Sequence, residues 1–198
     1  MQNLMTMHAA PADKLAMLRS EIDRIDDRLL DLIERRLDCA RQVAALKAAE
    51  ERPALKMRPR REQAIVDRMV GRARRAPAEL VQQVWRTIIS HSLQAQVRTE
   101  ILLCTNGDRA ELLDRVRDRF GPAAPCRWAA SAAEAVEAAR LGETVAVIAP
   151  ELLGEAEAEG LTRFERLRSG DGAVIGVAIG RLAEDEAEAA SECGRTER

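Results

Sequence analysis

Apolar residues recur at alternating steps of three and four along the first part of the chain. The residues that make this pattern are Leu15, Leu18, Ile22, Ile25, Leu29 and Leu32. Such spacing is typical of an amphipathic or coiled-coil helix. No glycine or proline interrupts the chain from Leu15 to Arg52, and Pro53 follows directly. We therefore predict one long helix that ends before Pro53, with Asp13 as its N-cap.

The predicted helix is long for a chain of this size. About 35 residues at about 1.5 Å per residue span about 50 Å, which exceeds the diameter of a compact domain of this length. Alone, such a helix would leave half of its apolar stripe in water. We therefore expect a partner helix from a second copy of the chain.

Two shorter helical patterns follow. The first runs from about Arg60 to Arg75, and the second begins near Pro77. The residues expected to face inward are Ile65, Val66, Met69, Val70, Val81, Val84, Trp85, Ile88 and Ile89. One long helix and two shorter ones predict an all-α domain over residues 13–98, which forms an intertwined helical homodimer.

The second half of the chain alternates between short apolar runs and helical patterns. The segments that read as strands are 100–105, 126–129, 144–150 and 172–180, with helices expected at 108–120 and 131–142. This alternation predicts a small α/β domain over residues 99–182. The polar ends, 1–12 and 183–198, are expected to be a flexible N-terminus and a disordered acidic tail.

Polar residues interrupt the faces that the three helices are expected to bury. Arg36 and Lys47 continue the stripe of the first helix, eleven residues apart, so they point almost the same way about 16 Å apart. Ser92 and Gln96 follow on the inner face of the third helix, and Glu62 lies one turn before the inner face of the second. A single residue of this kind usually snorkels or caps a neighbour. Five together predict a pocket, and its excess cations predict an anionic ligand.

The absence of certain catalytic groups limits the reactions that such a pocket could catalyse. We find no nucleophile–base pair and no glycine loop that would hold a phosphate, so acyl transfer and hydrolysis are poorly supported. A unimolecular rearrangement needs only a fixed conformation and stabilised charge. Arg19 lies about 25 Å before Arg36 on the same helix. It can therefore reach such a pocket only from an antiparallel partner chain.

The amino-acid composition disfavours some classes of binding partner, such as nucleic acids and membranes. The chain has 31 basic and 33 acidic residues, a net charge of −2, and only 2% aromatic residues. No general field for nucleic acid or an anionic membrane results, and base-stacking platforms are scarce. No segment approaches the roughly 20 apolar residues of a membrane span, and the N-terminus does not resemble a signal peptide.

Cysteine and histidine usage adds little chemistry. The four cysteines (Cys39, Cys104, Cys126 and Cys193) are far apart, without a CxxC pair, and the chain has two histidines. A zinc site or a disulfide framework is therefore not expected. We expect reduced thiols in a cytoplasmic protein that needs no metal and no cofactor.

The residues of the first half resemble those of the all-helical (type II) chorismate mutases. The resemblance covers about 14–97 and consists of the run LRSEIDRIDDRLLDLIERRLDCARQVAALK, the RE pair at Arg61 and Glu62, and the Ser92 and Gln96 spacing in SLQAQ. It implies an intertwined homodimer that converts chorismate to prephenate by a Claisen rearrangement, in phenylalanine and tyrosine biosynthesis.

The resemblance also implies a role for each matching residue. Arg19 of the partner subunit and Arg36 would bind substrate carboxylates, as would Ser92. Lys47 and Gln96 would bind the ether oxygen, where negative charge grows as the C–O bond breaks. Glu62, paired in sequence with Arg61, would accept a hydrogen bond from the substrate hydroxyl. The loop 52–60 is about two residues longer than the commonest spacing, and Arg58 stands where an acidic residue is usual.

Other interpretations remain open. An isochorismate pyruvate-lyase of the same fold would use nearly the same cations, and a regulatory helical dimer with a decayed site would need none of them. The segment LTRFERL (161–167) weakly resembles a motif of prephenate dehydratase. The roughly 100 residues after the helices are too few for that enzyme. The second half is then either a truncated, inactive dehydratase lobe or an unrelated α/β domain.

Overall fold

The protein is described by a computed structural model covering residues 11–47, 55, 57–154 and 159–183. The sequence-based expectations for residues 1–10, 48–52 and 184–198 lie outside these described residues. The chain divides into two compact units, Met1–Cys39 and Ala40–Arg198.

The long helix expected from the apolar stripe is present as α1, Pro11–Lys47. It begins at Pro11, three residues before the first helical residue that an N-cap at Asp13 implies, so Asp13 lies in its first turn and is not its N-cap. A proline fits the first turn of a helix because its missing N–H has no intrahelical acceptor there. Large apolar side chains along α1 are exposed, for example Ile22 (57%), Leu29 (52%) and Leu32 (58%).

The two shorter helices form an antiparallel hairpin. They are α2, Pro59–Arg72, and α3, Ala78–Gln96, so α2 ends three residues before the predicted Arg75. Val66, Val81 and Ile89 are buried as expected, whereas Val84 is 39% exposed. The sequence therefore predicted both helices, and of the nine side chains expected to face inward three are buried, five are half-buried and one is exposed.

The second half of the chain builds a five-stranded sheet in the order β2-β1-β3-β5-β4. Its strands are β1 (Glu100–Cys104), β2 (Cys126–Trp128), β3 (Thr144–Ile148), β4 (Thr162–Arg168) and β5 (Val174–Gly180). The first three are parallel, with Ile101 opposite Cys126 and Val145. β5 runs antiparallel to β3 and to β4. The predicted α/β domain is thus confirmed.

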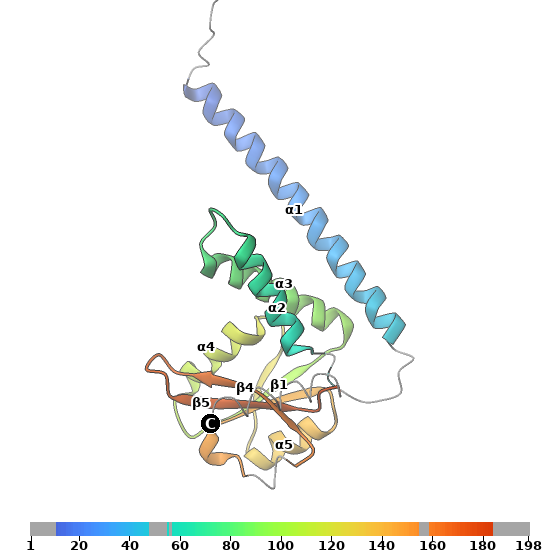
Figure 1. Ribbon diagram of the computed structural model, residues 1–198, viewed down its shortest axis with the longest axis vertical. Coiled ribbons are helices and arrows are strands. Elements are labelled where there is room, and N and C mark those ends of the chain that lie inside the picture. Colours follow the sequence, from blue (N-terminus) through green and yellow to red (C-terminus); the bar gives the residue numbers. More distant parts are fainter. Residues whose placement is uncertain (1–10, 48–54, 56, 155–158, 184–198) are drawn as a thin grey trace, which may run out of the picture. The chain divides into compact units, whose positions relative to one another are not determined.

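Helices cover both faces of the sheet. The helix α4, Arg109–Phe120, packs with Ile101, Leu103 and Val147 on one face. The other face holds α5, Ala132–Arg140, against Leu102 and Ala146. Right-handed crossovers explain this arrangement, because the chain moves from β1 to β2 and then back past β1 to β3. Figure 1 shows α4 and the α2–α3 hairpin on one side of the sheet and α5 on the other.

One strand was missed by the sequence pattern. The segment that contains LTRFERL forms β4, an edge strand that pairs only with β5. Its register shifts between Arg163 and Glu165, which breaks the simple alternation of apolar and polar positions. Charged side chains also protect an exposed sheet edge from further pairing. Because of both features, hydrophobic periodicity does not reveal this strand.

Two residues between α1 and α2, Leu55 and Met57, belong to the α/β core. Leu55 and Met57 are only 3% and 6% exposed and lie among the buried side chains on the α4 face of the sheet. The backbone N–H of Leu55 donates to the carbonyl of Arg181 at 2.8 Å. The chain therefore enters this core before it builds the helical hairpin. Among the described residues, no helix is both long enough and apolar enough to cross a membrane.

Candidate functional site

Three of the predicted site residues are on α1. Arg19 is exposed, and Arg36 is half-buried. Partial burial lowers the pKa of the Arg36 guanidinium, which remains a cation because free arginine titrates far above neutral pH. Lys47 is the last residue of α1, and its side chain lies outside the described part of the structure.

The RE pair occupies the first turn of α2. Arg61 is exposed, whereas Glu62 is buried, at 9% exposure. Oε1 of Glu62 accepts a hydrogen bond from the backbone N–H of Arg58 at 3.1 Å, at the N-terminus of the helix. A carboxylate is favoured there because the first N–H groups of a helix have no intrahelical acceptors. The local sequence therefore fixes where this acid lies.

Ser92 and Gln96 lie near the end of α3. The Ser92 hydroxyl is buried and donates to the carbonyl of Ile88 at 2.6 Å. The Gln96 amide donates to the carbonyl of Ser92 at 3.3 Å. Ser92 and Glu62 are two of the four buried polar residues in the described part of the chain. The hairpin thus keeps polar groups where its packing would favour apolar ones.

A hydrogen bond between the helices fixes the register of the hairpin. Nη2 of Arg86 on α3 donates to Oε1 of Gln63 on α2 at 3.3 Å. With about 1.5 Å per residue and antiparallel helices, Ser92 lies about 8 Å beyond Glu62 along the hairpin, and Gln96 about 14 Å beyond it. Glu62, Ser92 and Gln96 therefore share one end of the hairpin, the end nearest β1.

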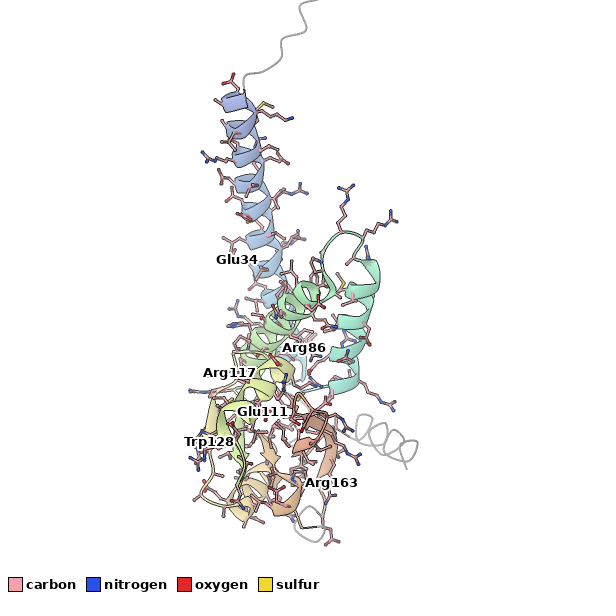
Figure 2. The ribbon with its side chains drawn as sticks, turned by 90° about the vertical axis from the view of Figure 1, so that its left-hand side faces the viewer. Glu34, Arg86, Glu111, Arg117, Trp128 and Arg163 are labelled. Carbon is pink, nitrogen blue, oxygen red and sulfur yellow. The ribbon has the colours of Figure 1, made fainter. Side chains whose placement is uncertain are left out.

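The charged groups that contact Glu62 were not predicted from the sequence. Nη1 of Arg119, near the end of α4, lies 3.6 Å from Oε2 of Glu62, and Nε of Arg119 pairs with Oε2 of Glu165 on β4. Nη1 of Arg86 donates to the backbone carbonyl of Arg119 at 3.0 Å. Figure 2 marks Arg86 on α3 above the sheet-bearing part of the chain. No sequence signal separates Arg119 from the other arginines of α4.

The pKa values reflect this crowding. Burial lowers the pKa of Arg86, the nearby charge of Arg119 lowers it further, and Glu165 and Glu62 oppose the change. Burial also raises the pKa of the thiols of Cys104 and Cys126, which makes them poor nucleophiles. The three described cysteines, Cys39, Cys104 and Cys126, are free thiols.

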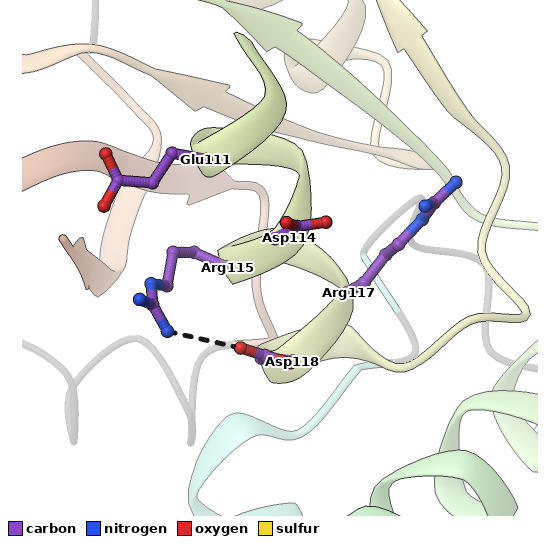
Figure 3. A pocket seen from close by; sticks show the side chains of 5 residues that line it. All are labelled: Glu111, Asp114, Arg115, Arg117 and Asp118. Carbon is purple, nitrogen blue, oxygen red and sulfur yellow. Dashed lines mark hydrogen bonds and ion pairs between the residues drawn. The ribbon is translucent and has the colours of Figure 1, made fainter. Parts of the chain in front are cut away.

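Hollows adjoin this network. One of about 660 Å³ lies between α3, α4 and β4, with Arg86, Arg119 and Glu165 in its wall. A second, of about 600 Å³, runs along α4 beside Glu111, Asp114, Arg115, Arg117 and Asp118. In Figure 3 Arg115 and Asp118 form an ion pair, whose atoms are 3.4 Å apart, and Arg117 points to the other side of the helix. The second hollow is lined by more acids than bases and does not suit an anion.

The carboxyl end of the parallel strands is where α/β sheets usually bind ligands. Here the carboxylate of Asp108 accepts hydrogen bonds from the backbone N–H groups of Ala110 and Glu111, at 2.8 and 3.1 Å. It thereby occupies the N-terminus of α4, where an anionic ligand would otherwise bind. The described residues contain no group of three metal-ligating side chains.

Comparison with protein families identifies the helical segment. Residues 18–97 match the family model of type II chorismate mutase. The match includes α2, α3 and most of α1, and it ends before β1. The N-terminal helical region is therefore similar to type II chorismate mutases over these residues, and the α/β domain that follows lies outside the match. The comparisons with curated proteins and with solved structures give no match.

Proposed function

We propose that the protein is a chorismate mutase, an isomerase that rearranges chorismate to prephenate in the biosynthesis of phenylalanine and tyrosine. The observation that carries the proposal is the family match over residues 18–97, within which every one of the seven candidate site residues falls. The buried polar residues Glu62 and Ser92 support it, because acidic and hydroxyl side chains are mostly exposed in proteins whereas these two lie on the inner side of the hairpin.

The proposed chemistry needs only positioning and fixed charge. Arg36, Arg19 of a partner subunit and Ser92 bind the two carboxylates of the substrate and hold it in a folded, chair-like conformation. Lys47 and Gln96 bind the ether oxygen, where negative charge grows as the C–O bond breaks. Holding the reactive conformer and stabilising this charge are both large contributions to a unimolecular reaction.

Glu62 completes the proposed site from α2. Its carboxylate accepts a hydrogen bond from the substrate hydroxyl and so sets the orientation of the ring, with Arg61 beside it in the RE pair. The proposal uses these side chains alone, with no metal and no cofactor.

The active form is proposed to be a homodimer. The exposed apolar stripe of α1 supports it, since Ile22, Leu29 and Leu32 are each more than half exposed in the single chain. The helical rise puts Arg19 about 25 Å from Arg36, so only an arginine from another subunit could complete the same site. We further propose functional boundaries at 13–98 for the mutase domain and 99–182 for the α/β domain, and a cytoplasmic location.

The test is a direct assay of the purified chain. Chorismate should be consumed with formation of prephenate, and isochorismate should not be cleaved to salicylate and pyruvate at a comparable rate. Cleavage of isochorismate without rearrangement of chorismate would instead support the lyase. If neither substrate reacts and a bicyclic transition-state analogue at saturation leaves the melting temperature unchanged, the helical dimer is not catalytic.

The α/β domain is proposed to have no dehydratase activity. Support comes from Asp108, whose carboxylate takes the N–H groups at the start of α4. Prephenate supplied to the purified protein should therefore yield no phenylpyruvate. Formation of phenylpyruvate above the spontaneous rate would contradict this part of the proposal.

A further inference from the structure

One side chain of the α/β domain, that of Arg119, contacts Glu62 of the proposed mutase site. Arg119 extends from the last turn of α4, and its Nη1 lies 3.6 Å from Oε2 of Glu62. The two side chains are only 10% and 11% exposed. Water and salt screen such a pair much less than an ion pair on the surface. The contact therefore joins a residue outside the matched segment to a residue inside it.

The Glu62 carboxylate is held from two sides. The backbone N–H of Arg58 donates to Oε1, and the guanidinium of Arg119 lies against Oε2. Each oxygen therefore has its own cationic or N–H partner, and rotation of the carboxylate would break both contacts. A carboxylate restrained in this way is oriented before a ligand arrives.

Arg119 is itself fixed by its surroundings. Its Nε pairs with Glu165 of β4, and its guanidinium lies 5.2 Å from the centre of the Phe120 ring. Its backbone carbonyl accepts from Arg86 of α3. The guanidinium is thus restrained by Glu165 and Phe120, and the backbone of the same residue is restrained by α3. A cation restrained in this way can orient a neighbouring acid, whereas a mobile surface arginine would not.

The end of α4 is also pressed against α3. At Gly121, directly after α4, an added Cβ would lie 2.5 Å from Cβ of Ser90, and the glycine has a φ of 77°. The hydroxyl of Ser90 accepts a hydrogen bond from the backbone N–H of Ala123 at 3.2 Å. This close approach keeps α4, and with it Arg119, at a constant position relative to the helical hairpin.

We propose that Arg119 is a positioning residue for Glu62, so that the α/β domain supplies part of the support for the mutase site. The inference rests on the proposed function, in which Glu62 accepts a hydrogen bond from the substrate hydroxyl. Arg119 does not touch the substrate in this proposal. It acts by holding the carboxylate in the orientation that the hydroxyl needs.

The experiment compares Arg119→Ala with Arg117→Ala in the full-length protein. Both variants remove one arginine from α4, but Arg117 is exposed and points to the other side of the helix from Arg115 (Figure 3). Arg119→Ala should raise KM for chorismate about tenfold while kcat changes less than about threefold, because a binding contact is misplaced. Arg117→Ala should leave both values unchanged.

A purely structural role for Arg119 predicts a different result. Loss of folded protein lowers the apparent kcat and leaves KM as it was, which circular dichroism and active-site titration would reveal. Arg119→Lys should recover part of the lost affinity, since it keeps the charge near Oε2. Glu165→Gln, which loosens Arg119 without removing it, should raise KM by a smaller factor, and it provides the measurement if Arg119→Ala does not fold.

The decisive comparison repeats Arg119→Ala in a Glu62→Gln background. If Arg119 acts through Glu62, the rise in KM should be largely absent there, because coupled residues are not additive. An equal rise in both backgrounds, or an unchanged KM in the single variant, overturns the inference while the proposed function stands. A wild-type chain that makes no prephenate overturns the proposed function, and this inference with it.

Discussion

The long helix exposes its apolar side chains, whereas the sheet buries them. Along α1, Ile22 and Leu29 are 57% and 52% exposed, whereas Ile101 and Val145 on neighbouring strands are completely covered. Burial of a large aliphatic side chain contributes about 1.5–3 kcal/mol. The sheet obtains this stabilisation from its own chain, but α1 leaves it unused. We infer that α1 obtains it from a second copy of the protein.

The largest expected effect follows from breaking the stripe of α1. Leu29→Asp should dissociate the dimer and reduce mutase activity below detection, because a buried charge opposes the association and the arginine from the partner subunit is lost. Sedimentation and the chorismate assay measure both effects. Arg24→Asp adds the same carboxylate on the opposite face of α1, where it only removes an exposed pairing with Glu21. If Leu29→Asp stays dimeric and active, α1 is not the interface.

The second-largest effect is expected for the cations that continue the apolar stripe of α1. Lys47→Ala should lower kcat about 100-fold or more, since an oriented donor at developing negative charge contributes roughly 3–4 kcal/mol. Arg35→Ala is the matched control, because Arg35 is exposed one position away from the stripe residue Arg36. A drop below tenfold for Lys47→Ala would remove it from the proposed mechanism.

A third test addresses the second region, where the segment before α2 enters the α/β core. Leu55→Ala should lower the free energy of unfolding by about 2–5 kcal/mol, the usual cost of such a truncation in a core. Urea denaturation of the full-length protein measures it. Leu80→Ala should cost much less, because Leu80 is 51% exposed. Equal values for both variants would show that Leu55 does not belong to this core.

The smallest effect tests the contact between α4 and α3. Gly121→Ala should cost about 2–4 kcal/mol, from an unfavourable positive φ and from a clash with Ser90. Gly172→Ala is the control, since it has a φ of 90° but nothing within 4 Å of an added Cβ. It should therefore cost about 1–2 kcal/mol. The difference between the two values in urea denaturation reports the close approach alone, and no difference would contradict it.

Local patterns made most of the elements predictable. The three-four spacing identified α1, and strand–helix alternation identified the α/β domain, because one buried face imposes a period on the sequence. The strand β4 was not predicted from such a pattern. It is an edge strand with a register shift between Arg163 and Glu165, so no regular face marks it. The burial of Leu55 and Met57 was not predicted either, because two apolar residues in a short linker show no periodicity.

Some features of the candidate site could likewise be predicted from the sequence, and others could not. Glu62, Ser92 and Gln96 could be selected because polar residues on an inner helix face stand out from their neighbours. That they share one end of the hairpin was decided by the structure, because the hydrogen bond between Arg86 and Gln63 sets the register of the two helices. Their roles, and those of Arg19, Arg36, Arg61 and Lys47, remain predictions that the proposed assays test.

The sequence by itself predicted the helices, the layered second domain and the polar positions from which the proposed site is built. Only the tertiary structure decided that Arg119 of α4 meets Glu62 of α2, and that Glu165 of β4 holds Arg119 in turn. The physical reason is that periodicity reports which face of an element is buried, but not which distant element covers it. Contacts between residues 57 and 46 positions apart depend on how the sheet and hairpin pack, and no local pattern encodes that.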